Sequence, residues 1–167
     1  MIASRNPSTV SFLILTSPPT YKDMVTAVPS NELEKNYNFL KSSIFGKFAF
    51  SILESKGLIE FFSDQFLFSE KCDSSWLDET EKEISVEARP PIQAFNAGLM
   101  QHRSFETELK QITQPTYIVS GVGDRRAKDR ADYSTEMNLC TLKTLDGVNV
   151  LPWESPRGVI DLIKELL

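Results

Sequence analysis

Three short apolar runs divide the chain, at 10–16, 115–121 and 140–145. The first is apolar at four successive positions, 12–15, and Pro18 and Pro19 follow it closely, whereas the second ends at Gly121. Runs of this length bounded by proline or glycine are typical of β-strands. Successive apolar residues also favour strands that are covered on both faces, as in a parallel sheet. We therefore predict three parallel strands.

The other regular pattern is helical. We predict helices that begin at Ser30, after Asp73 or Ser74 and at Pro91, and further helices at 104–111 and 126–137. The helix after Asp73 is expected to run to Val86, and the charged helix at 126–137 to lie on the surface. A last helix follows Ser155, where apolar residues recur at helical spacing. Eight of the eleven phenylalanines lie between 39 and 68, so this segment needs apolar packing of its own.

The order of elements is a strand, a long helical segment, and then alternating strands and helices. Alternation of this kind predicts an α/β fold with a parallel sheet. The helical segment is several times too long for a single crossover connection between two parallel strands, so we predict that it is an insertion. We predict a core formed by residues 1–25 and 104–167, with residues 26–103 inserted as a helical lid.

Composition excludes several functions. The net charge of −5 and the pI of about 5.0 give no overall attraction for nucleic acid. No stretch of about 20 uncharged apolar residues is present, so we predict no membrane span. Cys72, Cys140 and His102 are too few for a zinc site, and we predict no metal or cofactor. Two distant cysteines favour an intracellular, reducing compartment over secretion.

Three motifs resemble the α/β-hydrolase family, in particular its lid-bearing members. Gln-Pro-Thr at 114–116 enters a strand that leaves as Gly-Val-Gly-Asp at 121–124. Leu-Pro-Trp-Glu-Ser-Pro at 151–156 precedes an amphipathic helix, and Asn-Pro-Ser-Thr-Val at 6–10 enters the first strand. In this order, the motifs resemble the C-terminal part of the fold. The turn Pro-Pro-Thr-Tyr at 18–21 and the segment Asn-Val-Leu-Pro-Trp-Glu at 149–154 are similar to plant and algal members, and a longer precursor of that kind could be located in a plastid. The resemblance implies cofactor-free hydrolysis of ester or amide bonds by a serine nucleophile.

The resemblance also assigns site residues. Asp124 stands at the position of the triad acid, which orients the catalytic histidine in the family. The alternative is that Asp124 caps the following helix or pairs with Arg125 or Arg126. Asn149 occupies the position expected for the histidine, and an asparagine cannot accept a proton near neutral pH. The only histidine, His102, is expected to be a surface or capping residue.

We therefore predict a hydrolase-like protein that is inactive as written, because the sequence contains neither Gly-x-Ser-x-Gly nor a histidine after His102. Two alternatives remain open. One is a non-catalytic protein that binds a small apolar ligand in a lid pocket, and the other is an enzyme with a different residue set. Residues 1–6 are expected to be the last turn of a helix. An exposed edge of the strand at 12–15, together with one uncovered sheet face, predicts self-association.

Overall fold

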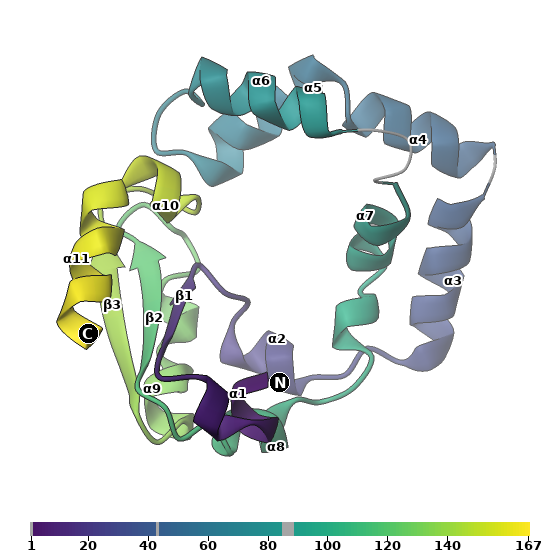
Figure 1. The fold of residues 1–167 in the computed structure, drawn as a ribbon. Coiled ribbons are helices and arrows are strands. Elements are labelled where there is room, and N and C mark those ends of the chain that lie inside the picture. Colours follow the sequence, from purple (N-terminus) through teal and green to yellow (C-terminus); the bar gives the residue numbers. More distant parts are fainter. Residues whose placement is uncertain (1, 43, 85–88) are drawn as a thin grey trace. The chain divides into compact units, whose positions relative to one another are not determined.

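The computed structural model describes residues 2–42, 44–84 and 89–167, which form two compact units (Figure 1). The first unit comprises Met1–Val25, Phe66–Ser69 and Ser104–Leu167. The second comprises Thr26–Gln65 and Glu70–Arg103. The short segment Phe66–Ser69 belongs to the first unit although it lies within the long helical stretch of the sequence. Whether the second unit serves as a lid stays a prediction.

The first unit contains a parallel sheet of three strands in the order β1-β2-β3. These are β1 (Leu13–Thr16), β2 (Thr116–Gly121) and β3 (Cys140–Leu145), and Thr116 pairs with Leu13 on one side and with Cys140 on the other. The predicted α/β class with three parallel strands is confirmed. Strand β1 begins at Leu13 rather than Val10, because pairing with β2 starts only where the backbone N–H of Leu13 donates to Pro115 O, at 2.9 Å.

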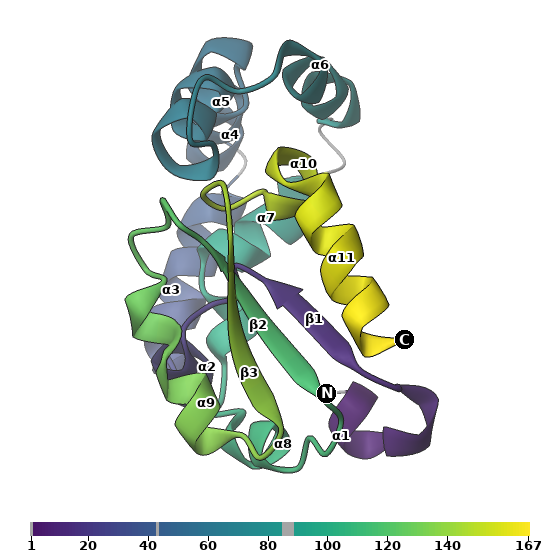
Figure 2. The same ribbon diagram turned by 90° about the vertical axis from the view of Figure 1, so that its left-hand side faces the viewer.

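Helices pack on both faces of the sheet (Figure 2). On one face Ile118 packs with residues from α1 (Ile2–Arg5), α2 (Tyr21–Val25), α8 (Glu106–Lys110) and α9 (Asp132–Glu136). On the other, Val119 packs with Leu151 of α10 (Leu151–Glu154) and Leu162 of α11 (Pro156–Leu166). The prediction that one face of the sheet is uncovered is therefore wrong, because successive residues of β2 point into two separate apolar cores. The helix predicted at the N-terminus is present as α1.

The prediction of one charged surface helix at 126–137 is wrong, because the segment is not a single helix and part of it is buried. Two short elements replace it, the 3-10 turn η5 (Lys128–Arg130) and α9. Arg130, Tyr133 and Met137 are all buried, at 5%, 2% and 4% exposure. Because they recur at spacings of three and four residues, they form a buried stripe on an otherwise polar segment.

The second unit is entirely helical in its described residues. Its helices are α3 (Ser30–Lys41), α4 (Phe45–Leu53), α5 (Lys56–Phe62), α6 (Ser74–Glu83) and α7 (Arg89–Asn96). The π-helical turn η2 (Ser63–Leu67) follows α5, and the 3-10 turn η4 (Leu99–Gln101) follows α7. In the first unit, the 3-10 turn η1 (Pro7–Thr9) precedes β1. Asp73 caps α6 as predicted, accepting hydrogen bonds from the backbone of Ser75 and Trp76. Ser30 is the first residue of α3 rather than its cap, and Val86 lies outside the described residues.

Few side chains of the second unit reach its interior. Leu33, Ile59, Leu77 and Ala97 are buried. Many larger apolar side chains are exposed, and they include Phe39, Ile44, Phe45, Phe48, Phe61, Phe62, Phe95 and Met100. Within the described part of the chain, no helix has both the length and the apolar character needed to cross a membrane.

Candidate functional site

The loops that follow the three strands meet at one edge of the sheet. They are residues 17–20 after β1, 122–126 after β2 and 146–150 after β3. All three strands are parallel, so their carboxyl ends point the same way. Ligands of open α/β sheets bind at this edge, which makes these loops the candidate functional site.

Glycines allow the second and third loops to touch. The backbone N–H of Gly123 donates to Gly147 O at 3.0 Å. A Cβ atom on Gly121 would collide with the carbonyl oxygens of Gly147 and Val148. Gly147 itself has a φ of 120°, and a Cβ there would lie 2.9 Å from Glu154 Oε2. A side chain at 121 would therefore separate the two loops, and one at 147 would be strained and would displace Glu154.

Asp124 lies in this turn, and both of its carboxylate oxygens are occupied. Oδ1 accepts a hydrogen bond from the backbone N–H of Arg126 at 2.8 Å, and Oδ2 forms an ion pair with Arg130 Nη1. The side chains of Asp124 and Arg130 are only 9% and 6% exposed. The alternative interpretation, in which Asp124 caps the next turn and pairs with an arginine, thus describes its contacts, although the arginine is Arg130 and not Arg125 or Arg126.

Arg130 also joins the other loops to this ion pair. Its Nε donates to Pro18 O in the first loop at 2.5 Å, and Nη1 lies 3.3 Å from Ser120 Oγ on β2. Tyr133, one turn later, donates its hydroxyl to Pro19 O at 2.9 Å. Burial raises the pKa of Tyr133 to about 12, so this hydroxyl stays a donor at physiological pH. The segment at 128–133 therefore holds the loop after β1 against the strand ends.

Asn149 is held by its backbone. Its N–H donates to Leu67 O at 3.0 Å, and the half-buried side chain makes no hydrogen bond with any residue that the structure describes. Glu154 supports the same loop, because Oε2 accepts from Val148 N at 2.8 Å and Oε1 from Ser69 N at 2.7 Å. The structure thus brings the loops of Asp124 and Asn149 together without a hydrogen bond between the two side chains.

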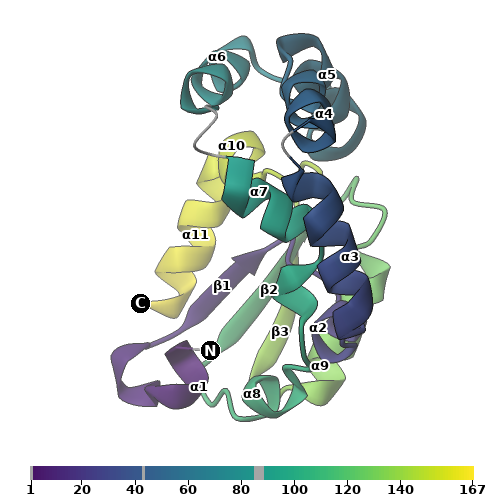
Figure 3. The ribbon, with the colours of Figure 1, turned by 90° about the vertical axis from the view of Figure 1, so that its right-hand side faces the viewer.

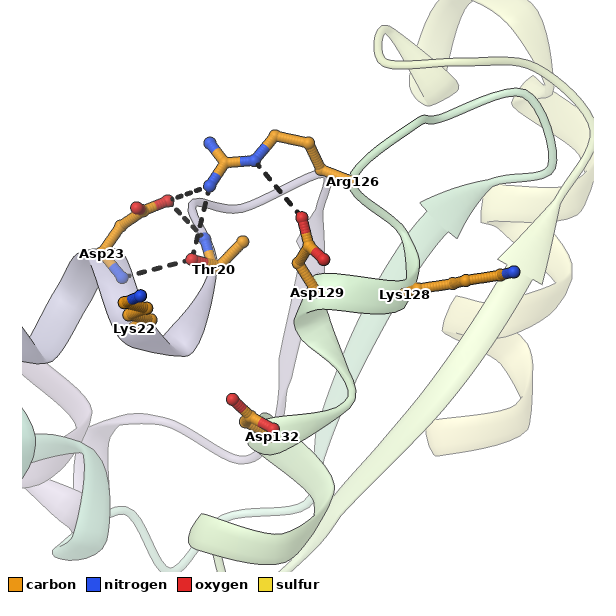
Figure 4. Close-up of a pocket in the computed structure, with 7 residues that line it drawn as sticks. All are labelled: Thr20, Lys22, Asp23, Arg126, Lys128, Asp129 and Asp132. Atoms are coloured by element: carbon orange, nitrogen blue, oxygen red, sulfur yellow. Dashed lines mark hydrogen bonds and ion pairs between the residues drawn. The ribbon is translucent and has the colours of Figure 1, made fainter.

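A polar pocket of about 560 Å³ lies beside these loops, between α2 and the segment at 126–132 (Figure 4). Its rim carries Arg126, whose Nη2 is 2.6 Å from Asp23 Oδ2 and 3.4 Å from Thr20 Oγ1. Burial acts to raise the pKa of Asp23, but hydrogen bonds from Thr20 and the pairing with Arg126 outweigh it and hold that pKa below its ordinary value. The remaining lining residues are Lys22, Lys128, Asp129 and Asp132.

His102 lies in the second unit, where Nδ1 is 3.0 Å from Leu99 O, the geometry of a residue that closes a helical turn. The described residues contain no group of three or more histidine, cysteine or acidic side chains placed to hold a metal ion.

Sequence reasoning missed the roles of Arg130 and Asp23. The spacing of Arg130, Tyr133 and Met137 was the available signal, because an arginine on an apolar helical stripe faces the interior and needs an anionic partner. Asp124, six residues before Arg130, is that partner. For Asp23 the sequence holds no comparable signal, since its partner Arg126 is about a hundred residues away.

Chemically, the loops offer an anchored carboxylate, that of Asp124, and they contain no histidine. A guanidinium stays protonated in proteins, so Arg130 cannot replace an imidazole as a base. The side-chain amide of Asn149 in the third loop also lacks a basic nitrogen. These residues can position a loop or a polar ligand, and they do not form a nucleophile–base pair.

No family model and no curated protein sequence matches the chain. Its structure is similar to the enol-lactonase from Burkholderia xenovorans LB400, with 12% identity and a TM-score of 0.64 over 99% of this chain and 59% of that one. A thermophilic esterase from Thermogutta terrifontis gives 14% identity and a TM-score of 0.63, over 98% and 57%. The α/β hydrolase MGS-M2 from a Medee basin deep-sea metagenome library gives 11% and 0.57, over 98% and 58%.

At these identities the likeness concerns the fold alone. The chain spans only 57% to 59% of the length of these three structures. The resemblance seen in the motifs at 121–124 and 151–156 therefore extends to three dimensions. The chain has the architecture of part of an α/β-hydrolase fold.

Proposed function

We propose that this polypeptide is hydrolase-like in fold, that it does not catalyse hydrolysis by itself, and that its second unit acts as a helical lid. The observation that carries the proposal is the buried ion pair between Asp124 and Arg130. In a serine hydrolase the corresponding carboxylate orients an imidazole. Here a guanidinium and a backbone N–H each bind one oxygen of the carboxylate, and Asn149 occupies the position predicted for the histidine. The similarity to plant and algal members stays a prediction.

The test is an esterase assay on the purified chain with p-nitrophenyl butyrate at neutral pH. We expect nitrophenol release no faster than in buffer for the wild type and for Asn149→His, because an imidazole alone supplies no elbow-mounted nucleophile. Saturable turnover that Asp124→Asn abolishes, in a variant whose melting curve shows that it is folded, would overturn the proposal. Such a result would identify the chain as an enzyme with a different residue set.

A second candidate function rests on the second unit. Phe39, Phe45 and Phe48 are 64%, 68% and 67% exposed. Because burial of apolar surface contributes about 25 cal/mol per Å², a ligand that covered these side chains would gain binding energy from them. Exposed apolar patches of this kind mark sites of ligand or partner binding. We infer that a small apolar ligand, bound without turnover, is the occupant that would cover these side chains.

Decanol serves as the probe for this candidate. At a hundred times its Kd, a ligand that binds only the folded state stabilises it by about 2.7 kcal/mol, so the melting temperature should rise. Phe48→Ser should weaken that rise. The matched control is Leu139→Ser in the first unit, a residue that is 55% exposed and should leave it unchanged. Equal losses in both variants, or no rise in the wild type, would exclude the candidate.

A further inference from the structure

The segment Phe66–Ser69 is bound to the third strand-end loop through backbone hydrogen bonds. Leu67 O accepts from the N–H groups of Asn149 and Val150, at 3.0 and 3.4 Å. Leu67 is the last residue of η2, whereas Asn149 and Val150 directly precede α10, which leads into α11 (Figure 3). A carbonyl at the end of one helical turn therefore meets N–H groups at the start of another, and each satisfies groups that a helix end leaves unpaired.

The carboxylate of Glu154 joins the same two segments a second time. Oε1 accepts from the N–H of Ser69 at 2.7 Å, and Oε2 accepts from that of Val148 at 2.8 Å. A carboxylate acceptor makes hydrogen bonds about twice as strong as a neutral one. Four backbone N–H groups are therefore satisfied by Glu154 or by Leu67, those of Ser69, Val148, Asn149 and Val150.

Phe66–Ser69 is the tip of a loop that closes on itself. Asp64 Oδ1 accepts from the N–H of Cys72 at 2.7 Å, so the two ends of the loop at 64–72 lie together. At the tip, Phe68 is buried, whereas Ser69 beside it is exposed. Compact loops whose ends lie together often carry a function, and contiguous segments of this kind can open as a unit.

We propose that the loop at 64–72 is a latch, held closed by Glu154, which sets the position of the loop that carries Asn149. When the carboxylate releases Ser69, Leu67 O moves away with the latch, and the N–H of Asn149 loses its acceptor. Asn149 is the residue at the position predicted for a histidine, so opening of the latch displaces that position.

The latch also gives the second unit a means of acting on this loop. The chain on both sides of Phe66–Ser69 belongs to the second unit. A ligand that binds the second unit more tightly with the latch open would shift the latch toward that state, and Asn149 would move with it. The inference rests on contacts within the first unit, and it holds whether or not the chain lacks hydrolytic activity.

Hydrogen exchange on the purified 167-residue chain tests the latch. In the wild type, the amides of Ser69, Val148 and Asn149 should share one protection factor, because a single opening event releases all three. That protection factor should lie below that of Thr116, whose amide in the central strand donates to Leu139 O. This measurement needs no substitution, so it decides the question even where a variant fails to fold.

Glu154→Gln sharpens the test. Glutamine has one acceptor oxygen in place of two, so one of the two N–H groups would face the side-chain NH₂. Asn149 is not bonded to Glu154, yet its amide should exchange at least about tenfold faster, the change expected when a hydrogen bond to a charged group is lost. Glu165→Gln is the matched control, because this carboxylate also accepts two hydrogen bonds, from the side chains of Tyr117 and Lys143, and it should leave Asn149 unchanged.

Three results would overturn the proposal. The first is a set of unrelated protection factors for the three amides, or a common one equal to that of Thr116, which would mean that they open only with the whole fold. The second is faster exchange of Ser69 and Val148 in Glu154→Gln with no change at Asn149, because the carboxylate would then support two separate hydrogen bonds and no common opening. The third is an equal effect of the two glutamine variants on Asn149.

Discussion

Arg126 and Arg130 lie four residues apart, and each pairs with an aspartate. Arg126 is 55% exposed and pairs with Asp23 at the rim of the polar pocket, where water can replace either partner. Arg130 is 6% exposed and contacts Asp124, Ser120 and Pro18, which belong to the ends of two strands. The same residue type thus makes an exchangeable surface pair in one place and a buried connection in the other.

The difference shows how burial decides the role of a charge. A buried ion must be fully paired, because loss of one partner leaves the other without either water or a counter-charge. The buried pair therefore specifies how the loops after β1 and β2 lie, and it engages the carboxylate for which the motif predicts the position of a triad acid. The exposed pair has no such constraint, and its contribution to stability is screened by solvent.

The largest effect is expected for Arg130→Met. We predict a loss of about 3–5 kcal/mol in the free energy of unfolding, because Asp124 would stay buried without its partner. Urea denaturation followed by circular dichroism measures this change. Replacing both partners, as Arg130→Met with Asp124→Leu, should recover most of the loss, since no unpaired charge then remains buried.

Arg125→Met provides the control for that measurement. Arg125 is exposed in the same turn, and its substitution should change stability by no more than about 0.5 kcal/mol. If Arg130→Met cost as little as Arg125→Met, the contrast between the two arginine environments would be lost. The ion pair would then no longer explain the loop positions.

A smaller effect is expected for Asp23→Asn, about 0.2–1 kcal/mol at neutral pH. The pKa of Asp23 is lowered in the folded chain, so the unfolded chain binds its proton first as the pH falls. The pair with Arg126 therefore stabilises the protein above the ordinary aspartate pKa of about 4, and this contribution disappears at more acidic pH.

Melting temperatures of the wild type and Asp23→Asn should accordingly differ at neutral pH and converge below pH of about 4. High salt should reduce the neutral-pH difference, because both partners are partly exposed. A difference that persists unchanged in acid would mean that Asp23 acts through its hydrogen bonds with Thr20 and not through its charge.

Several elements of the fold could be read from the amino-acid pattern. Two of the three strands begin within one residue of the predicted position, because a short run bounded by Pro or Gly leaves few alternatives. The cap at Asp73 was predictable for a similar reason, since it depends on residues two and three positions away. The helix at 126–137 failed because Arg130 and Tyr133 hold distant carbonyl groups, and a segment shaped by such contacts does not follow helical propensity alone.

The candidate site was predictable only in part. Asp124 and Asn149 could be located from motifs along the chain, but their roles remain predictions. The sequence did not show that Arg130 is the partner of Asp124, because this pairing depends on the path of the segment at 128–133 after β2. The exposure of Phe45 and Phe48 was equally beyond reach, because an apolar residue on a helix can face either an interior or a surface.

The sequence by itself determined the α/β class, the three strands and the absence of both Gly-x-Ser-x-Gly and a histidine beyond His102, because these are properties of local order along the chain. Tertiary structure alone decided that Arg130 pairs with Asp124 and that Glu154 anchors the loop of Asn149. Each of these depends on residues from separate strands or loops, and only folding sets the distances between them.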